Sequence, residues 1–327
     1  MKNLVAQTSR WPWLEIKTPN DSLNNKKFLW PKVTIVTPSF NQGRYLEETI
    51  RSVLLQGYPN LEYLIIDGGS TDNSIEIIRK YEPWLAFWIS EPDNGQADAI
   101  NKGFIKSTGA YLGWLNSDDI LYPSAIFRVV EAFRLKPDAD MIYGDIEQGE
   151  SLEREVRPLK GEQIEFSEML KTLRVPIPQQ GSLWRRTVIE SVGLLDYRWN
   201  VVLDREFYTR VAEKFHVHYL PGPLGFFRNH ELSKSISQGE DWLSELPQMY
   251  KEYFERKDLP HKLRLLYCET MGSMYMTCAV IAFRSGETLR AAVFLALAQK
   301  VDLLLLFRKQ RFSKVVRYLK SKMSSSS

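Results

Sequence analysis

The first half of the chain alternates short apolar runs with longer amphipathic stretches. The short runs are rich in β-branched residues, which is typical of buried parallel strands. They occupy residues 33–37, 61–67, 85–90, 111–116 and 141–146. The stretches between them repeat apolar residues at helical spacing, which predicts helices over 45–56, 97–107 and 123–133 and around Ile75, Ile77 and Ile78.

Strands that alternate with helices of this length indicate right-handed βαβ units and a doubly wound, mainly parallel sheet. In such sheets ligands bind outside the carboxyl ends of the strands. These ends are polar and rich in turn residues here: Pro38–Asn41, Asp67–Ser70, Asp93–Gly95 and Asn116–Asp119. We therefore expect them to line one edge of the sheet and to form the binding site.

Asp118 and Asp119 directly follow a buried strand. Two adjacent carboxylates repel each other unless a cation or hydrogen-bond donors lie between them. Mg²⁺ or Mn²⁺ bound to a nucleotide diphosphate is one such partner, because these ions prefer oxygen ligands. The alternative is that one aspartate caps the helix that follows. The convergence of the other polar strand ends favours the metal site.

Composition bounds the other possibilities. With 327 residues, 44% hydrophobic and 25% charged, the chain can bury a sizeable core. Its net charge of +3 gives no reason to expect nucleic-acid binding. Cys268 and Cys278 lie in a helical pattern without metal-ligand spacing and are predicted to be reduced thiols in a cytoplasmic protein. The N-terminal residues lack the apolar stretch of a signal peptide.

Four motifs resemble those of family 2 glycosyltransferases: Val-Thr-Ile-Val-Thr-Pro-Ser-Phe-Asn (33–41), Ile-Ile-Asp-Gly-Gly-Ser-Thr-Asp (65–72), Asp-Asn-Gly-Gln with Asn-Lys-Gly (93–103) and Trp-Leu-Asn-Ser-Asp-Asp (114–119). The resemblance covers about residues 32–233. It implies the GT-A fold, a nucleotide-diphosphate sugar donor, a divalent metal (Mn²⁺ or Mg²⁺) and inversion at the anomeric carbon.

The resemblance assigns nucleotide binding to the strand ends. Asp67 matches the family's aspartate that accepts the N3–H of uracil, although capping of its own turn fits the same chemistry. Asn116 would contact the ribose and Asp118 the metal, while an asparagine at the first position of the usual Asp-x-Asp motif removes one charge. The nucleotide pocket implied in this way comprises Pro38, Ser39, Asn41, Asp67, Asp93 and Asn116.

The second half supplies the acceptor side. Asp204 matches the family's catalytic base, with Glu206 as the second candidate and a helix cap as the alternative for Asp204. Phe226–His230 with Ser233–Ser235 resembles the family's closing segment, so His230 would ligate the metal or contact the diphosphate. The candidates for acceptor contact are Asp119, Gln179, Gln180, Trp184 and Glu206, with packing as an equal alternative for Trp184.

The last third changes character, because strand patterns stop near Glu240 and helical ones continue. We expect a lead-in over 1–31, a glycosyltransferase domain over 32–238 (nucleotide-sugar half to about 120) and a helical extension over 239–327. Residues 291–307 are too short for a membrane span and predict a buried helical hairpin. Basic residues alternate with apolar ones over 308–322, which predicts an amphipathic helix. Its basic face would either bind an anionic membrane surface or be exposed to solvent on a docked helix.

The sequence therefore predicts an inverting, metal-dependent glycosyltransferase. It would use a nucleotide-diphosphate sugar, with UDP favoured, and a glycan or lipid-linked glycan acceptor in cell-surface polysaccharide assembly. We expect it in the cytoplasm, with peripheral association at the inner membrane face as a further option. The alternative is a catalytically degenerate nucleotide-sugar-binding or scaffold subunit, which Asn116 favours. A dinucleotide oxidoreductase is disfavoured because no Gly-x-Gly-x-x-Gly follows a strand.

Overall fold

The computed structural model describes Pro12 and residues 29–175, 177–231 and 239–303. The chain divides into two compact units. The first comprises residues 1–163 and 176–233, and the second comprises 164–175 and 234–327. Residues 164–175, which the sequence placed inside the glycosyltransferase domain, thus belong to the helical unit.

A mixed sheet of nine strands, counted over the described residues, forms the centre of the first unit. Its order is β3-β2-β1-β4-β8-β6-β9-β5, with β7 paired to β6. The strands are β1 Val33–Ser39, β2 Leu61–Asp67, β3 Phe87–Ser90, β4 Tyr111–Trp114, β5 Ile120–Leu121, β6 Met141–Gly149, β7 Arg157–Leu159, β8 Leu183–Arg185 and β9 Val217–Arg228.

The parallel part of the sheet confirms the predicted fold class. Strand β1 pairs in parallel with β2 and β4, β2 with β3, and β6 with β9. Strand β8 lies antiparallel between β4 and β6, so those two strands point the same way. The carboxyl ends of β1, β2, β3, β4, β6 and β9 consequently share one edge of the sheet.

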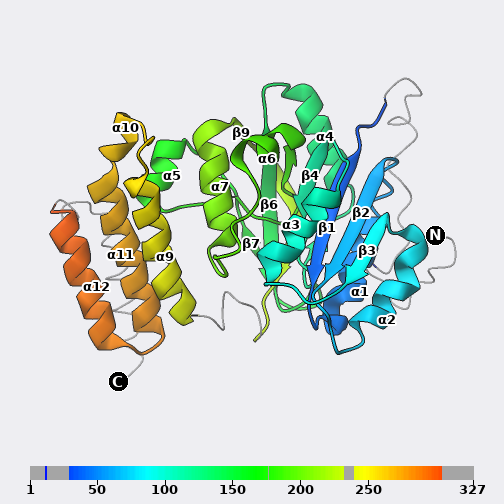
Figure 1. Cartoon of the computed structure of the whole chain (residues 1–327), viewed down its shortest axis with the longest axis horizontal. Coiled ribbons are helices and arrows are strands. Elements are labelled where there is room, and N and C mark those ends of the chain that lie inside the picture. The colour runs from blue at the N-terminus through cyan, green and yellow to red at the C-terminus, as the bar shows by residue number, and fades with distance from the viewer. Residues whose placement is uncertain (1–11, 13–28, 176, 232–238, 304–327) are drawn as a thin grey trace. The chain divides into compact units, whose positions relative to one another are not determined.

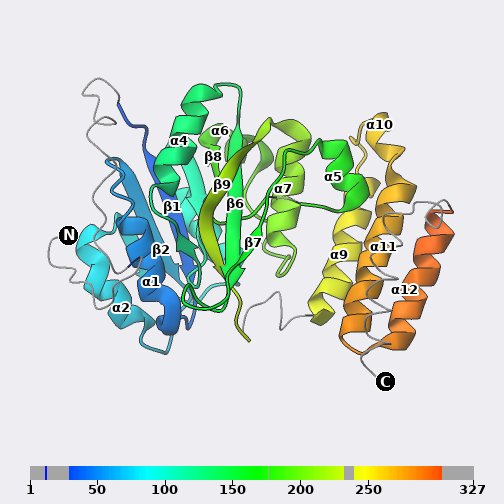
Figure 2. The same cartoon turned by 180° about the vertical axis from the view of Figure 1, so that it is seen from behind.

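Helices cover both faces of this sheet (Figures 1 and 2). Val33 and Ile35 belong to the core formed with α1, α2 and α4. Val36, which points the other way, touches Gly103 of α3 so closely that a Cβ there would lie 2.4 Å from it. The helices are α1 Gly43–Leu54, α2 Ser74–Tyr81, α3 Gln96–Lys106, α4 Ala125–Leu135, α6 Arg186–Val192 and α7 Leu203–Lys214.

Helix α1 fixes the loop that follows β4. Thr49 is buried, and its hydroxyl donates to the carbonyl oxygens of Ser117 (2.9 Å) and Asp119 (2.7 Å). Ser52 Oγ accepts from the backbone N–H of Leu121 at 3.1 Å. The polar side of α1 therefore holds the backbone of the loop after β4, while the apolar side of α1 packs in the core.

The carboxylate of Asp119 is completely buried and joins three parts of the unit. Its Oδ2 accepts from Gln180 Nε2 at 2.7 Å, and its Oδ1 accepts from the backbone N–H of Arg228 at 3.0 Å. Burial and the neighbouring Asp118 carboxylate raise the pKa of Asp119 well above its usual range. Asp119 and Gln180, both predicted to face the acceptor, are instead bonded to each other beneath the surface.

The second unit is helical among the residues described. Helix α11 (Tyr267–Arg284) packs against α9 (Gly239–Glu255), α12 (Thr288–Val301) and the short α5 (Phe166–Thr172), and α10 spans His261–Arg264. Ser273 Oγ donates to the Lys171 carbonyl at 2.7 Å, which ties α5 to α11. This contact explains why residues 164–175 cluster with the later helices.

Helix α12 forms the predicted hairpin with α11 but is not a buried helix. Only Ala291 and Ala298 of α12 are fully buried, whereas Leu289 is 82% and Val293 is 52% exposed. Within the described residues, no helix combines the length and apolar character needed to cross a bilayer. The lead-in, apart from Pro12 and 29–31, and the basic stretch over 308–322 lie outside the described residues.

Replacement of Asp119 tests its place in the fold. In Asp119→Ala, Gln180 Nε2 and the Arg228 N–H lose their acceptor, and each unpaired buried donor costs about 1–3 kcal/mol. We expect urea titration to show a loss of about 2–4 kcal/mol in the free energy of unfolding. The control is Asp118→Asn, where a loss under about 1 kcal/mol is expected because the isosteric amide is partly exposed. An equal loss in both variants would contradict the assignment.

Candidate active site

The turn after β1 is hydrogen-bonded to the turn after the neighbouring strand β2. The Ser39 carbonyl accepts from Gly68 N at 2.8 Å, and the buried Ser39 hydroxyl has no hydrogen-bond partner among the described residues. Asn41 adopts a φ of 51°, which asparagine tolerates better than most residues. Its Oδ1 accepts from Thr71 N at 2.8 Å. Asn41 thus joins the two turns, and Ser39 leaves a free polar atom between them.

Asp67 is fully buried at the end of β2. Its Oδ2 accepts from Gly69 N (3.1 Å), Ser70 N (2.8 Å) and Ser90 Oγ (2.7 Å), and its Oδ1 accepts from Ser70 Oγ. The capping role that the sequence allowed is therefore present. Recognition of a base by Asp67 stays a prediction, and Oδ1, which accepts one hydrogen bond, retains capacity for a second.

Asp93 and Asn116 lie at the same edge of the sheet, after β3 and β4. Asp93 Oδ1 accepts from Gly95 N at 2.8 Å, and its Oδ2 would lie 2.7 Å from a Cβ at Gly68. Only glycine at 68 lets the two turns approach so closely. Asn116 Oδ1 accepts from Gln96 Nε2, at the start of α3, at 2.7 Å. The structure thus brings the predicted nucleotide residues into one continuous row along the carboxyl edge.

Asp118 and His230 form a pair at the centre of this edge. Asp118 Oδ2 lies 2.9 Å from His230 Nε2, and the two side chains are 18% and 11% exposed. The His230 ring packs on Tyr45 of α1, with ring centroids 4.8 Å apart. Residues 112 positions apart are thus brought together, and both side chains are only slightly exposed.

Arg228 is a buried cation beneath that pair. Its Nη2 forms an ion pair with Glu48 of α1, and its Nε donates to the Asp118 carbonyl at 2.9 Å. Its guanidinium lies over the Tyr45 ring, 4.8 Å from the centroid. Arg228 therefore fixes the backbone of Asp118 and supplies positive charge where Asp118, Asp119 and Glu48 converge.

Asp204 lies in the first turn of α7. Helix α7 leads into β9, so its N-terminal end lies toward the carboxyl edge of the sheet, and Tyr208 of the same helix stacks on Trp114 at the end of β4. Burial raises the pKa of the Asp204 carboxyl, while the N–H and the charge of Arg205 oppose that rise. The end of α7 that carries Asp204 therefore lies toward the carboxyl edge of the sheet, on the face that α3 and α7 cover.

Trp184 and Glu206, both predicted to contact the acceptor, are engaged in other contacts. Trp184 is fully buried and packs against Phe104, Trp114 and Phe207, with ring centroids 5.7, 5.3 and 5.2 Å away. The packing alternative therefore describes it. Glu206, the second candidate for the base, is held by Arg210 through Nε (2.6 Å) and Nη2 (2.9 Å). That pairing engages both carboxylate oxygens of Glu206.

Sequence reasoning missed the residues that support the site. Phe40 follows β1 and is 59% exposed, so an aromatic face is open beside the first turn. Tyr45, Glu48 and Arg228 order the Asp118 loop from α1 and β9. The available signal was the arginine inside the quoted segment Phe226–His230, because a charged residue at the end of a buried strand needs a partner.

The sequence matches known glycosyltransferases. The model of glycosyl transferase family 2 matches residues 34–190. An uncharacterised glycosyltransferase of Mycobacterium tuberculosis is 31% identical over 185 residues, which are 56% of this chain and 69% of that protein. The region matched by the family model contains the first of the four motifs from Thr34 onward and the other three in full.

Solved structures share the fold. S. aureus TarS 1–349, in complex with UDP-GlcNAc, superposes with a TM-score of 0.58 at 13% identity over 83% of this chain and 92% of that one. The chain spans 45% of the longer TarS chain. The mannosyltransferase PcManGT of Pyrobaculum calidifontis, in complex with GDP-Man and Mn²⁺, gives a TM-score of 0.58 at 17% identity over 83% and 76%. With its GT-A fold and these sequence matches, the chain belongs to glycosyl transferase family 2 and is a sugar transferase.

Proposed function

We propose that the protein transfers a sugar, with inversion, from a UDP- or dTDP-sugar to a hydroxyl of a glycan or lipid-linked glycan acceptor. The observation that carries this proposal is the single edge at which Ser39, Asp67 and Asn116 line up with the Asp118–His230 pair. The nucleotide would lie along the turns after β1 and β2, with its base against Phe40. Asp67 Oδ1 would accept the N3–H of the base in addition to the Ser70 hydroxyl.

The residues present fit a divalent cation that arrives with the donor. Among the described residues, no group of three or more His, Cys, Asp or Glu side chains forms a cage for a metal. Asp118 Oδ2 and His230 Nε2 would supply two adjacent ligand atoms once the 2.9 Å hydrogen bond between them opens, and phosphate oxygens commonly complete such sites. Bound Mn²⁺ or Mg²⁺ would neutralise charge on the leaving diphosphate. Asn116 does not remove a ligand in this arrangement, since its Oδ1 is bonded to Gln96.

Asp204 would act as the base. Its carboxylate takes the proton of the acceptor hydroxyl while that oxygen bonds to the anomeric carbon, and the bond from that carbon to the diphosphate oxygen breaks with its electron pair. The raised pKa of Asp204 makes it a stronger base than an exposed aspartate. Attack opposite the leaving group inverts the anomeric centre.

The family and helix α12 bear on the acceptor and on the cellular setting. A glycan or glycolipid acceptor in cell-surface polysaccharide assembly agrees with the family, and the exposed Leu289 and Val293 on α12 agree with a peripheral protein. Membrane attachment would depend on the basic stretch over 308–322.

The metal ligands can be tested one at a time. Asp118→Asn should weaken the apparent Mn²⁺ constant for donor turnover by about tenfold or more, because one charged ligand is lost. His230→Gln should weaken it less, because a neutral ligand is replaced. The exposed Asp138 provides a control, Asp138→Asn, with no expected change. Measurement is by UDP release at varied Mn²⁺, and an unchanged constant in Asp118→Asn would remove Asp118 from the metal site.

The base is tested by Asp204→Asn, which should lower kcat by about 10²–10⁴ and leave the donor KM close to that of the wild type. In the wild type, acid should reduce the rate as Asp204 is protonated, with a midpoint above the usual aspartate pKa of about 3.9. Asp196→Asn is the control, since Asp196 pairs with Arg198 in the loop before α7. Normal kcat in Asp204→Asn would transfer the role to another group.

A further inference from the structure

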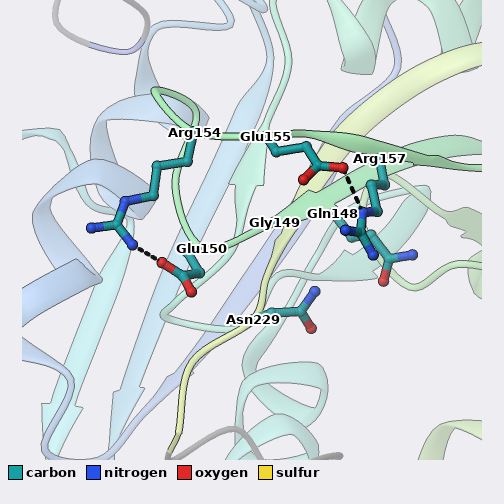
Figure 3. Close-up of a pocket in the computed structure, with 7 residues that line it drawn as sticks. All are labelled: Gln148, Gly149, Glu150, Arg154, Glu155, Arg157 and Asn229. Atoms are coloured by element: carbon teal, nitrogen blue, oxygen red, sulfur yellow. Dashed lines mark hydrogen bonds and ion pairs between the residues drawn. The ribbon is translucent and has the colours of Figure 1, made fainter. Parts of the chain in front are cut away.

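A pocket of about 450 Å³ opens where β6 ends, and its lining includes Asn229, the residue before His230 (Figure 3). Its lining comes from the end of β6, the turn into β7 and the residue after β9. The side chains that line it are Gln148, Glu150, Arg154, Glu155, Arg157 and Asn229. Pockets for small ligands commonly measure roughly 300–1,000 Å³, so this one can hold a sugar-sized molecule.

Hydrogen bonds of Asn229 and Arg228 link the lining of the pocket to the active-site edge. Asn229 immediately precedes His230, and its backbone N–H donates to the Gly149 carbonyl at 2.8 Å. Arg228 Nη1 donates to the Glu150 carbonyl at 3.4 Å, while its Nε holds the Asp118 carbonyl. A ligand in the pocket would therefore lie against Asn229, which stands between Arg228, the residue that holds the Asp118 carbonyl, and His230.

The charges of the lining cancel. Arg154 pairs with Glu150, and Arg157 Nε lies 3.0 Å from Glu155 Oε1. All four side chains are 64–74% exposed, so these pairs are weak and can rearrange around a ligand. An anionic ligand would gain two guanidinium groups but would also meet two carboxylates.

The remaining polar groups are amides with free capacity. Within the described part of the chain, the side-chain amides of Gln148 and Asn229 make no hydrogen bond. Each can donate and accept, as a sugar hydroxyl does. Since no large apolar side chain lines the pocket, a lipid tail there would leave these polar groups unpaired.

We propose that this pocket binds an uncharged, hydroxyl-rich sugar unit. That this sugar belongs to the acceptor rests on the proposed function. Gln148 and Asn229 would each bond to ring hydroxyls, and the Arg–Glu pairs would donate to and accept from the others. The pocket would select neutral glycans over anionic or lipid groups.

Ligand-observed NMR on the full chain tests the proposal without knowledge of the donor. The probes are methyl glucoside, methyl galactoside and methyl mannoside, with glucuronate and glucose 1-phosphate as anionic sugars. At least one neutral glycoside should bind the wild type more tightly than either anion. Gln148→Ala and Asn229→Ala should each weaken that binding by about tenfold, the change expected for about 1.4 kcal/mol.

Arg134→Ala is the matched control, because Arg134 forms a similar exposed pair with Glu131 on α4, outside the pocket. It should leave glycoside binding unchanged, and thermal unfolding should show that all variants are folded. Tighter binding of the anions, unchanged binding in both amide variants, or no glycoside binding would each overturn the proposal. Absence of UDP binding by the wild type, with glycoside binding lost in the amide variants, would contradict the proposed function and leave the pocket assigned.

Discussion

Two adjacent carboxylates at the end of a buried strand are the constraint on which the site depends. The structure resolves it by separating the roles of Asp118 and Asp119. Asp119 turns inward, where Gln180 and the Arg228 backbone satisfy its oxygens. Asp118 turns outward to His230. Buried donors thus satisfy one carboxylate, while the other lies nearer the surface, where the proposed cation would bind.

Helix α1 and strand β9 maintain that separation. Thr49 fixes the loop carbonyls, Glu48 neutralises Arg228, and Tyr45 packs against both the Arg228 guanidinium and the His230 ring. The support comes from two elements already anchored in the core on their other sides. Side chains held in place in this way need little rearrangement when a charged group binds beside them.

Local patterns were enough to predict much of this arrangement. Alternating strands and helices placed Asp67, Asn116 and Asp118 at one edge, because the carboxyl ends of parallel strands coincide. They could not reveal that Glu48 meets Arg228, 180 positions away. Trp184 illustrates the same limit, since whether a tryptophan stacks on a sugar or fills a core depends on Phe104 and Phe207 from other helices.

Local patterns were also insufficient to predict the division of the chain into two units. The sequence of residues 164–175 carries no sign that α5 packs on α11, nearly a hundred residues later. A short helix pattern inside an α/β domain gives no information about its partner. For Trp184, Gln180 and α5, burial among distant elements, rather than the local pattern, decides where the residues lie.

Calorimetric titration of the protein with UDP, dTDP and GDP, each with and without Mn²⁺, tests the central claim most directly. The account predicts binding of UDP or dTDP that depends on Mn²⁺, with weaker binding of GDP, because Asp67 would accept the N3–H of a pyrimidine and Asp118 would hold the metal. Equal binding of GDP would contradict the role of Asp67. Binding that is indifferent to Mn²⁺, or no binding of any of the three, would contradict the proposed donor site.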